Sequence, residues 1–167
     1  MESEPGVERV IVVGVDGSKG SRRAMAWVLE EARARDAVVR AVLVWDDPYT
    51  VIGPAPPVSA MGDDGVDRLH TTLADVVEAA LGDSPGSAVK IDQRVVSGHP
   101  VKVLCGLAAG ADMLVLGSRG RSRWGEFLLG SVSHACAQVA PVPVVIVPPS
   151  DRMPPGEAAP GGRADGG

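Results

Sequence analysis

The sequence predicts a single α/β domain in which a parallel β-sheet is covered by helices on both faces, a doubly wound arrangement. Three observations lead to this prediction. Short runs of β-branched residues, apolar at nearly every position, fit strands that are buried on both faces. These runs alternate along the chain with segments of helical periodicity, which indicates parallel strands joined by right-handed crossovers. The length of 167 residues suits one domain of this kind.

Apolar patterning predicts the first three elements. Val10–Val15 is a β-branched run and predicts the first strand, and residues 16–20 (Asp-Gly-Ser-Lys-Gly) follow as a loop. Apolar side chains then recur at i, i+3, i+4 and i+7 from Met25, which predicts a helix over residues 24–35. Val38–Trp45 is a second apolar run, interrupted only by Arg40, and predicts the second strand.

The remaining elements alternate in the same way. Four prolines mark residues 46–65 as a long loop, and residues 66–81 carry the clearest amphipathic pattern of the chain. Residues 88–96 alternate loosely and predict a strand near the sheet edge. Pro100 predicts the start of the next helix, because its missing N–H is not needed at a first helical position. The last predicted elements are a strand over residues 113–116, a helix over 132–139 and a strand over 142–147.

Composition bounds the folded part of the chain and its classes of partner. Half of the residues from 148 to 167 are Gly or Pro, a share typical of disorder. We therefore expect a flexible N-terminus over residues 1–7, a folded domain over 8–148 and a disordered tail over 149–167. The net charge of −5 argues against nucleic-acid binding through a basic surface. The sequence has no apolar run of membrane-spanning length and no positively charged leader, so we expect a cytoplasmic protein.

Neither the cysteines nor the histidines form a recognisable metal or redox motif. Cys105 and Cys136 lack CxxC spacing and lie in apolar helical contexts, which favours a reduced, structural pair. His70, His99 and His134 fall on or beside three different predicted helices, and none has a second ligand at metal spacing. We therefore expect no metal site built from protein side chains.

Two predicted strand ends carry residues that point to a ligand. In doubly wound sheets, ligands bind beyond the carboxyl ends of the strands, where the strand order reverses. Glycines allow the backbone to approach a ligand closely, a helix N-terminus offers N–H groups to an anion, and arginines add cationic donors. The first strand ends in Gly14-Val15-Asp16-Gly17-Ser18, the fourth ends in Gly117-Ser118-Arg119-Gly120-Arg121-Ser122-Arg123, and Gly130-Ser131 opens the next helix. These features predict a phosphate cradle, with a glycine-rich turn bearing solvated arginines as the alternative.

The familiar phosphate and hydrolase motifs are missing from the sequence. It contains no P-loop, no G-x-G-x-x-G after the first strand and no G-x-S-x-G nucleophile elbow. Asp16, at the first strand end, is open to three roles: it can bind a ribose hydroxyl, bind a metal, or cap the following helix.

The glycine spacing after the fourth strand resembles one known family. Gly117-x2-Gly120-x9-Gly130-Ser131 has the G-x2-G-x9-G-[ST] form of the ATP-binding class of universal stress proteins. Residues 12–18, 96–100, 111–120, 128–133 and 141–147 are similar to further segments of that family, in the same order. The resemblance covers residues 10–148. It implies a single-domain member with a five-stranded sheet in the order 3-2-1-4-5, the adenine nucleotide alpha hydrolase-like fold.

The resemblance also implies a ligand and a set of site residues. ATP, bringing Mg²⁺ with its phosphates, would bind where the first and fourth strands end. Asp16 would bind the ribose, and the backbone at Gly14 and Val15 would approach the nucleotide. Val44 would meet adenine through its main chain, or Trp45 if the alignment slips by one residue. The phosphates would lie against Gly117, Ser118, Arg119, Gly120, Arg121, Gly130 and Ser131. Trp124 departs from the family pattern, as a large aromatic residue within the nine-residue insert; it would fasten this loop to the body, or pack over the nucleotide.

The same resemblance implies a stress-response regulator and not an efficient enzyme. No general base, Walker-type lysine or water-positioning residue can be named, so no catalytic residue is assigned; slow hydrolysis assisted by Arg121 or Arg123 stays open. A non-nucleotide-binding interaction module of the same fold is the alternative, and the complete glycine motif argues against it. An adenylate-forming enzyme would need a further catalytic signature that the sequence lacks.

A homodimer is the expected assembly. Residues 142–147 are apolar and uncharged and would form an edge strand in this order, which invites pairing with another chain. Family members often dimerise through this strand. A regulatory protein partner is also expected, but nothing in the sequence specifies it.

Overall fold

The computed structural model describes residues 8–45, 63–82, 89–118 and 129–148 of the chain. Five parallel strands form one sheet in the order β3-β2-β1-β4-β5, which confirms the predicted fold class and the strand order implied by the resemblance. The strands are β1 (Val10–Val15), β2 (Val38–Trp45), β3 (Ile91–Ser97), β4 (Met113–Gly117) and β5 (Val144–Val147). The helices are α1 (Lys19–Arg35), α2 (Asp63–Leu81), α3 (Pro100–Ala108) and α4 (Ser131–Val139).

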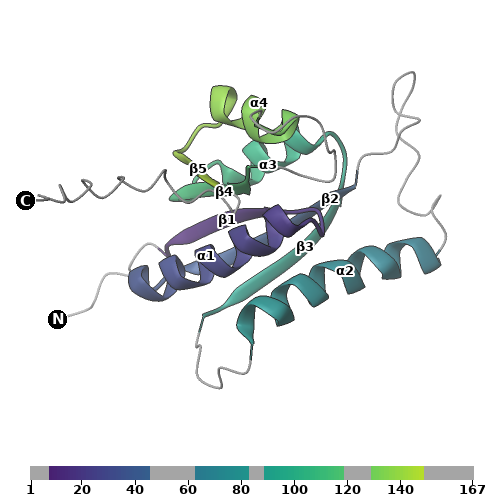
Figure 1. Ribbon diagram of the computed structural model, residues 1–167. Coiled ribbons are helices and arrows are strands. Elements are labelled where there is room, and N and C mark those ends of the chain that lie inside the picture. Colours follow the sequence, from purple (N-terminus) through teal and green to yellow (C-terminus); the bar gives the residue numbers. More distant parts are fainter. Residues whose placement is uncertain (1–7, 46–62, 83–88, 119–128, 149–167) are drawn as a thin grey trace, which may run out of the picture.

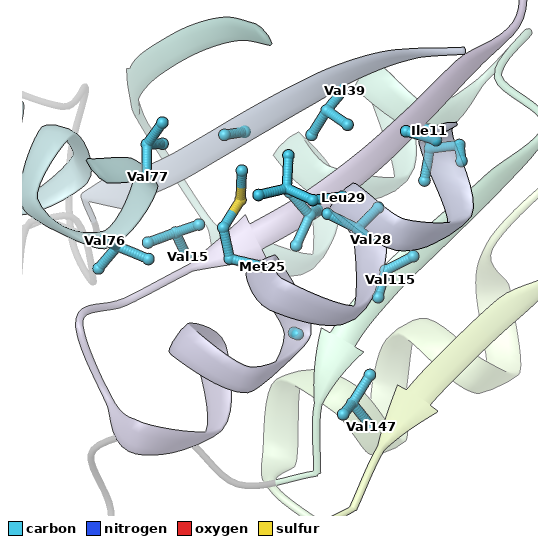
Figure 2. Close-up of a cluster of buried hydrophobic side chains, with 14 of the residues drawn as sticks. Ile11, Val15, Met25, Val28, Leu29, Val39, Val76, Val77, Val115 and Val147 are labelled. Carbon is cyan, nitrogen blue, oxygen red and sulfur yellow. The ribbon is translucent and has the colours of Figure 1, made fainter. Parts of the chain in front are cut away.

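Helices cover both faces of the sheet, α1 and α2 on one face and α3 and α4 on the other (Figure 1). Successive residues of a strand point to opposite faces. In β1, Val13 accordingly belongs to the core under α1 and α2, and Val12 to the core under α3 and α4. Figure 2 shows the first of these cores, in which Met25 and Leu29 of α1 lie among side chains of the sheet.

The helix after β1 begins at Lys19, five residues before the predicted start. Ser18 is its N-cap: the Ser18 Oγ accepts the Ser21 N–H at 3.2 Å, and the Ser18 carbonyl accepts the Arg22 N–H at 3.1 Å. The prediction of a loop over residues 16–20 was therefore wrong for its last two residues. Apolar periodicity could not reveal this first turn, because its side chains are small or polar.

Other element boundaries differ by a few residues from the predictions. Residues 63–65 belong to α2, so the predicted loop over 46–65 was wrong for those three, and residues 46–62 lie outside the described residues. The third strand begins and ends later than residues 88–96. The fourth strand extends to Gly117, and α4 includes Ser131.

The edge strand β5 is shorter than predicted. Val142 and Pro143 precede it, and only the four residues Val144–Val147 form the strand. The Pro143 carbonyl still accepts the Leu114 N–H at 2.9 Å, but proline has no N–H with which to extend the ladder.

The strand at the opposite edge of the sheet, β3, carries charged side chains, whereas β5 carries none. Asp92 of β3 accepts hydrogen bonds from Arg94 (Nε to Oδ2, 2.9 Å) and from Arg40 of β2 (Nε to Oδ2, 3.0 Å). The hydrogen bond from Arg94 and then that from Arg40 hold the pKa of Asp92 below its ordinary value of 3.8, so this carboxylate stays charged at neutral pH. Charges on an edge strand oppose pairing with another chain.

Among the described helices, none is long and apolar enough to cross a membrane.

Candidate functional site

The carboxyl ends of β1 and β4 lie side by side in the sheet. Val13 pairs with Val115, and continuing that register places Val15 opposite Gly117. The chain leaves β1 toward α1 on one face and leaves β4 toward α4 on the other face (Figure 1). The strand order therefore reverses at this point, which is where doubly wound folds bind ligands.

The turn after β1 is shaped by Asp16 and Gly17. Gly17 has a φ of 79°, in the left-handed region that favours glycine. The Asp16 Oδ1 accepts the Ser18 N–H at 3.0 Å, which closes an Asx turn. Of the three roles left open for Asp16, helix capping falls to Ser18 instead, and Asp16 holds the turn that leads to the cap.

Gly117 is in contact with the backbone of α1. A Cβ added at Gly117 would lie 2.6 Å from the carbonyl carbon of Gly20 and 2.8 Å from its oxygen. The absence of a side chain at Gly117 thus lets the end of β4 pack against the first turn of α1. Sequence reasoning assigned Gly117 to phosphate binding alone and gave no role to Gly20, because nothing in the sequence pairs these two residues.

Gly14 serves packing on the other face of the sheet. A Cβ there would lie 2.6 Å from the Leu116 Cδ2 and 3.4 Å from the Leu104 Cδ1. Both leucines belong to the core under α3 and α4. Gly14 thereby leaves room for these two side chains at the end of β1.

Three hydrogen bonds hold the two predicted phosphate-binding segments in place, one between the segments themselves and one each from the first segment to β5 and to α4. The Gly130 N–H donates to the Ser118 carbonyl at 2.8 Å, and the Ser118 N–H donates to the Val147 carbonyl at 2.9 Å. The Ser133 hydroxyl donates to the Gly117 carbonyl at 2.7 Å. The structure therefore brings Gly117, Ser118, Gly130 and Ser131 together. The remaining predicted residues of this loop, Arg119, Gly120 and Arg121, lie outside the described residues, as do Arg123 and Trp124.

Polar groups at this junction suit an anion. Gly130 is the N-cap of α4 and no side chain caps the helix, so the N–H groups of its first turn point outward with the positive end of the helix dipole. The Ser118 Oγ is buried and makes no hydrogen bond to any described residue. Backbone amides and an unsatisfied hydroxyl are the donors that a phosphate group accepts.

The alternation of β2 distinguishes Val44 from Trp45. The Trp45 carbonyl accepts the Gly98 N–H at 2.9 Å, so the main chain of Trp45 faces β3. Because successive residues of a strand direct their main-chain groups to opposite neighbours, the carbonyl of Val44 faces β1. Val15, the last residue of β1, pairs with Leu43, so the Val44 carbonyl lies beyond that strand's end. Of these two residues, Val44 is therefore the one whose carbonyl has no neighbouring strand residue opposite it.

Among the residues that the structure describes, the titratable side chains outside this junction form no comparable cluster. Within the described part of the chain, no group of three or more His, Cys, Asp or Glu side chains is placed to hold a metal ion. Cys105 and Cys136 are free thiols. His70 lies in α2, His99 precedes α3 as its N-cap residue, and His134 lies in α4.

Comparison with known proteins decides the family. The model of the universal stress protein family matches residues 8–148. The chain belongs to the universal stress protein family. A universal stress protein of Mycobacterium tuberculosis is 36% identical over 136 residues, which are 81% of this chain and 44% of that protein. One of Mycolicibacterium smegmatis is 32% identical over 139 residues, 83% of this chain and 45% of that protein. This universal stress protein therefore spans about half the length of the curated relatives it matches.

Solved structures agree with the fold of this universal stress protein. A universal stress protein in complex with cAMP has a TM-score of 0.59 and 29% identity, and the match covers 85% of this chain and 98% of that one. A universal stress protein from Archaeoglobus fulgidus has a TM-score of 0.65 and 23% identity over 84% of this chain and 98% of that one. A structure of the universal stress protein from that organism in complex with dAMP has a TM-score of 0.52 and 19% identity, and the match covers 84% of this chain and 98% of that one. The two archaeal likenesses show the fold alone.

Proposed function

We propose that this universal stress protein binds ATP between the carboxyl ends of β1 and β4 and acts as a cytoplasmic stress-response regulator. The observation that carries the proposal is the junction itself, where hydrogen bonds join the two glycine segments beneath the uncapped start of α4. The 29% identical relative solved with cAMP supports an adenine nucleotide as the ligand.

The described residues fit the parts of ATP. The amide of Ser131 and its neighbours in the first turn of α4, together with the Ser118 hydroxyl, would hold phosphate oxygens. Gly117, Ser118 and Gly130 would line the same site with their backbone, since the Ser118 and Gly130 N–H groups already donate to carbonyls. Arg119, Gly120 and Arg121 join them on motif spacing alone. Asp16, with the adjoining backbone of Gly14 and Val15, would lie against the ribose, and the Val44 carbonyl would accept a hydrogen bond from the adenine amino group. Mg²⁺ would arrive with the phosphates, whose charge it neutralises.

We further propose that the protein is a binding protein with at most slow ATP hydrolysis. The sequence has no Walker-type lysine, and we assign no catalytic residue. ATP would then act as a signal whose presence changes what the protein contacts. The partner that responds would be a protein, recognised through surfaces next to the site.

Substitution of Ser131 tests the ATP site with little effect on folding. Ser131 is exposed and occupies the first turn of α4. An aspartate there stabilises the helix through its dipole but repels a phosphate at the same N-terminus. We expect ATP at about 100 times its dissociation constant to raise the free energy of unfolding of the wild type by roughly 2.7 kcal/mol. Ser131→Asp should fold normally and bind ATP at least ~10-fold more weakly.

Ser131→Asn is the matched control, because it has nearly the same shape without the charge. It should bind ATP like the wild type. The measurement is urea unfolding of nucleotide-free protein with and without Mg·ATP, repeated with AMP to separate phosphate from adenosine contributions. If millimolar ATP leaves wild-type stability unchanged, the proposal is wrong and the interaction-module alternative takes its place. If Ser131→Asp binds like Ser131→Asn, the phosphates lie elsewhere.

We also propose a homodimer that forms through β5. Its four residues are apolar and uncharged, whereas the other edge strand carries Asp92 and Arg94. Only the β5 edge therefore lacks charges that oppose pairing. Light scattering on a size-exclusion column should give twice the chain mass of 17.1 kDa at micromolar concentration.

Lysine substitutions at the two edges test which strand pairs. Val144 of β5 and Val96 of β3 are both half-buried valines on edge strands that face the same core. Val144→Lys should give a monomer, and Val96→Lys should remain dimeric. A monomeric wild type, or loss of the dimer only in Val96→Lys, would rule out pairing through β5.

A further inference from the structure

Ser133 is a buried polar side chain whose hydrogen bond leaves its own helix. It is 6% exposed and is the third residue of α4. Its hydroxyl donates to the Gly117 carbonyl at 2.7 Å, across 16 positions of the chain. The ladder between β1 and β4 ends at the pair Val13 and Val115, two residues before Gly117. Ser133 therefore supplies a donor to the strand end that lies beyond this ladder.

The peptide between Gly117 and Ser118 is held on both sides. Its carbonyl accepts the Ser133 hydroxyl, and its N–H donates to the Val147 carbonyl at 2.9 Å. The next carbonyl, that of Ser118, accepts the Gly130 N–H at 2.8 Å. The backbone on each side of the Ser118 Cα is thus fixed by α4 and β5, and rotation about χ1 is the freedom that the side chain of Ser118 retains.

The side chain that is held in this way carries a hydroxyl group without a protein partner. The Ser118 Oγ is buried and makes no hydrogen bond to any described residue. Burying a polar group without a partner is unfavourable, so such a group calls for a function. A hydroxyl donates a strong hydrogen bond to a charged phosphate oxygen, and the adjoining N-terminus of α4 attracts the same anion.

We propose that Ser133 is a positioning residue for the nucleotide: it holds the Gly117 carbonyl so that the Ser118 hydroxyl meets a phosphate oxygen. This inference rests on the proposed function, because it names how one donor of that site is held. The Ser133 hydroxyl proton is already donated to the Gly117 carbonyl, so Ser133 acts through Ser118. Without that bond, the peptide keeps its bond to Val147 and can tilt about the line between its two Cα atoms.

A purely structural role for Ser133 predicts a different outcome. Alanine is a better helix former than serine and keeps the backbone amide of residue 133, so Ser133→Ala preserves α4 and its dipole. If Ser133 served stability alone, Ser133→Ala would unfold more easily, but the folded protein would bind ATP as the wild type does. If Ser133 acts through Ser118, the affinity for ATP falls while the affinity for adenosine, which has no phosphate, stays the same.

Amide hydrogen exchange of the nucleotide-free protein tests the positioning by itself. The Ser118 N–H belongs to the peptide that Ser133 holds, so it should open more often in Ser133→Ala. We expect it to exchange at least about 10-fold faster than in the wild type. The reference is the Val39 N–H, which donates to the Lys90 carbonyl at 2.9 Å between β2 and β3 and reports any change in global stability. A Ser118 rate that changes no more than the Val39 rate would overturn the proposal.

A double-mutant cycle tests whether Ser133 acts on the nucleotide through Ser118. Ser118→Ala and Ser133→Ala should each weaken ATP binding about 10-fold, the order of one hydrogen bond to a charged group. Because both remove the same contact, the double variant should bind ATP like Ser118→Ala alone. Losses that multiply to about 100-fold would mean that the two residues act independently, and the proposal would be wrong.

Ser133→Thr and Ser133→Val form a matched pair, since their side chains have nearly the same shape and differ in the hydroxyl. Ser133→Thr should bind ATP more tightly than Ser133→Val, and equal affinities would contradict the proposal. The alanine variants suffice should the added methyl groups prevent folding. If the wild type binds ATP and Ser133→Ala binds it equally well, this inference alone falls. If the wild type fails to bind ATP, the proposed function falls with it, while hydrogen exchange still decides whether Ser133 holds the peptide.

Discussion

Gly117→Ala is expected to lower the free energy of unfolding by about 3 kcal/mol, the upper range for overpacking a well-packed contact. The added Cβ would lie 2.6 Å from the carbonyl carbon, 2.8 Å from the oxygen and 3.0 Å from the Cα of Gly20. These are backbone atoms of the first turn of α1, so no side-chain rotation relieves the clash. Either α1 or the end of β4 must move, and both are anchored in the core. Urea unfolding followed by circular dichroism measures the change.

Gly106→Ala is the matched control for this substitution. Gly106 lies on the exposed side of α3, and a Cβ there would meet no atom within 4 Å. Alanine should therefore stabilise the protein by up to about 1 kcal/mol through its higher helix propensity. An unchanged urea midpoint for Gly117→Ala would contradict the close approach of β4 and α1.

The contact at Gly117 also affects how the nucleotide site is probed. A bulky substitution at Gly117 would disturb the fold together with any phosphate contact, so loss of binding would not locate the phosphates. Ser131 is a better position because its side chain is exposed.

Leu116→Ala is expected to cost about 3 kcal/mol of stability, typical of a leucine truncated in a core. Leu116 is 4% exposed and belongs to the core under α3 and α4. Its Cδ2 would lie 2.6 Å from a Cβ at Gly14, so Gly14→Ala alone should also destabilise, by about 1–2 kcal/mol. Combining the two relieves the clash and fills part of the cavity. The double variant should therefore lose less than the sum of the two, by at least about 1 kcal/mol.

Leu29 provides the control for this double-mutant cycle. It is 1% exposed, but it lies in the core on the other face of the sheet. Leu29→Ala and Gly14→Ala should therefore be additive. If the losses of stability in Gly14→Ala and Leu116→Ala are additive, packing against Leu116 does not explain why residue 14 is a glycine. If the variant that combines Gly14→Ala with Leu116→Ala binds ATP as tightly as the wild type, a close approach of the nucleotide does not require a glycine at position 14.

Particular residues show where prediction from sequence succeeded. Val10–Val15 and Val38–Trp45 have the bounds that were predicted, since a buried strand between two loops leaves a continuous apolar run. Pro100 begins α3 as predicted. The start of α1 was placed too late, because a capping serine followed by a small or polar first turn leaves no apolar period. The last strand was predicted too long, because apolar Val142 could not be told from a strand residue.

The amino-acid sequence by itself determined the fold class, the succession of elements, the family resemblance and the strand ends at which to look for a site. These follow from local periodicity and from spacings along the chain. Only the tertiary structure decided that Gly117 packs against Gly20 and that Gly14 makes room for Leu116. Each of these depends on which atoms from distant parts of the chain surround a residue, and that arrangement exists only once the sheet and its helices have packed.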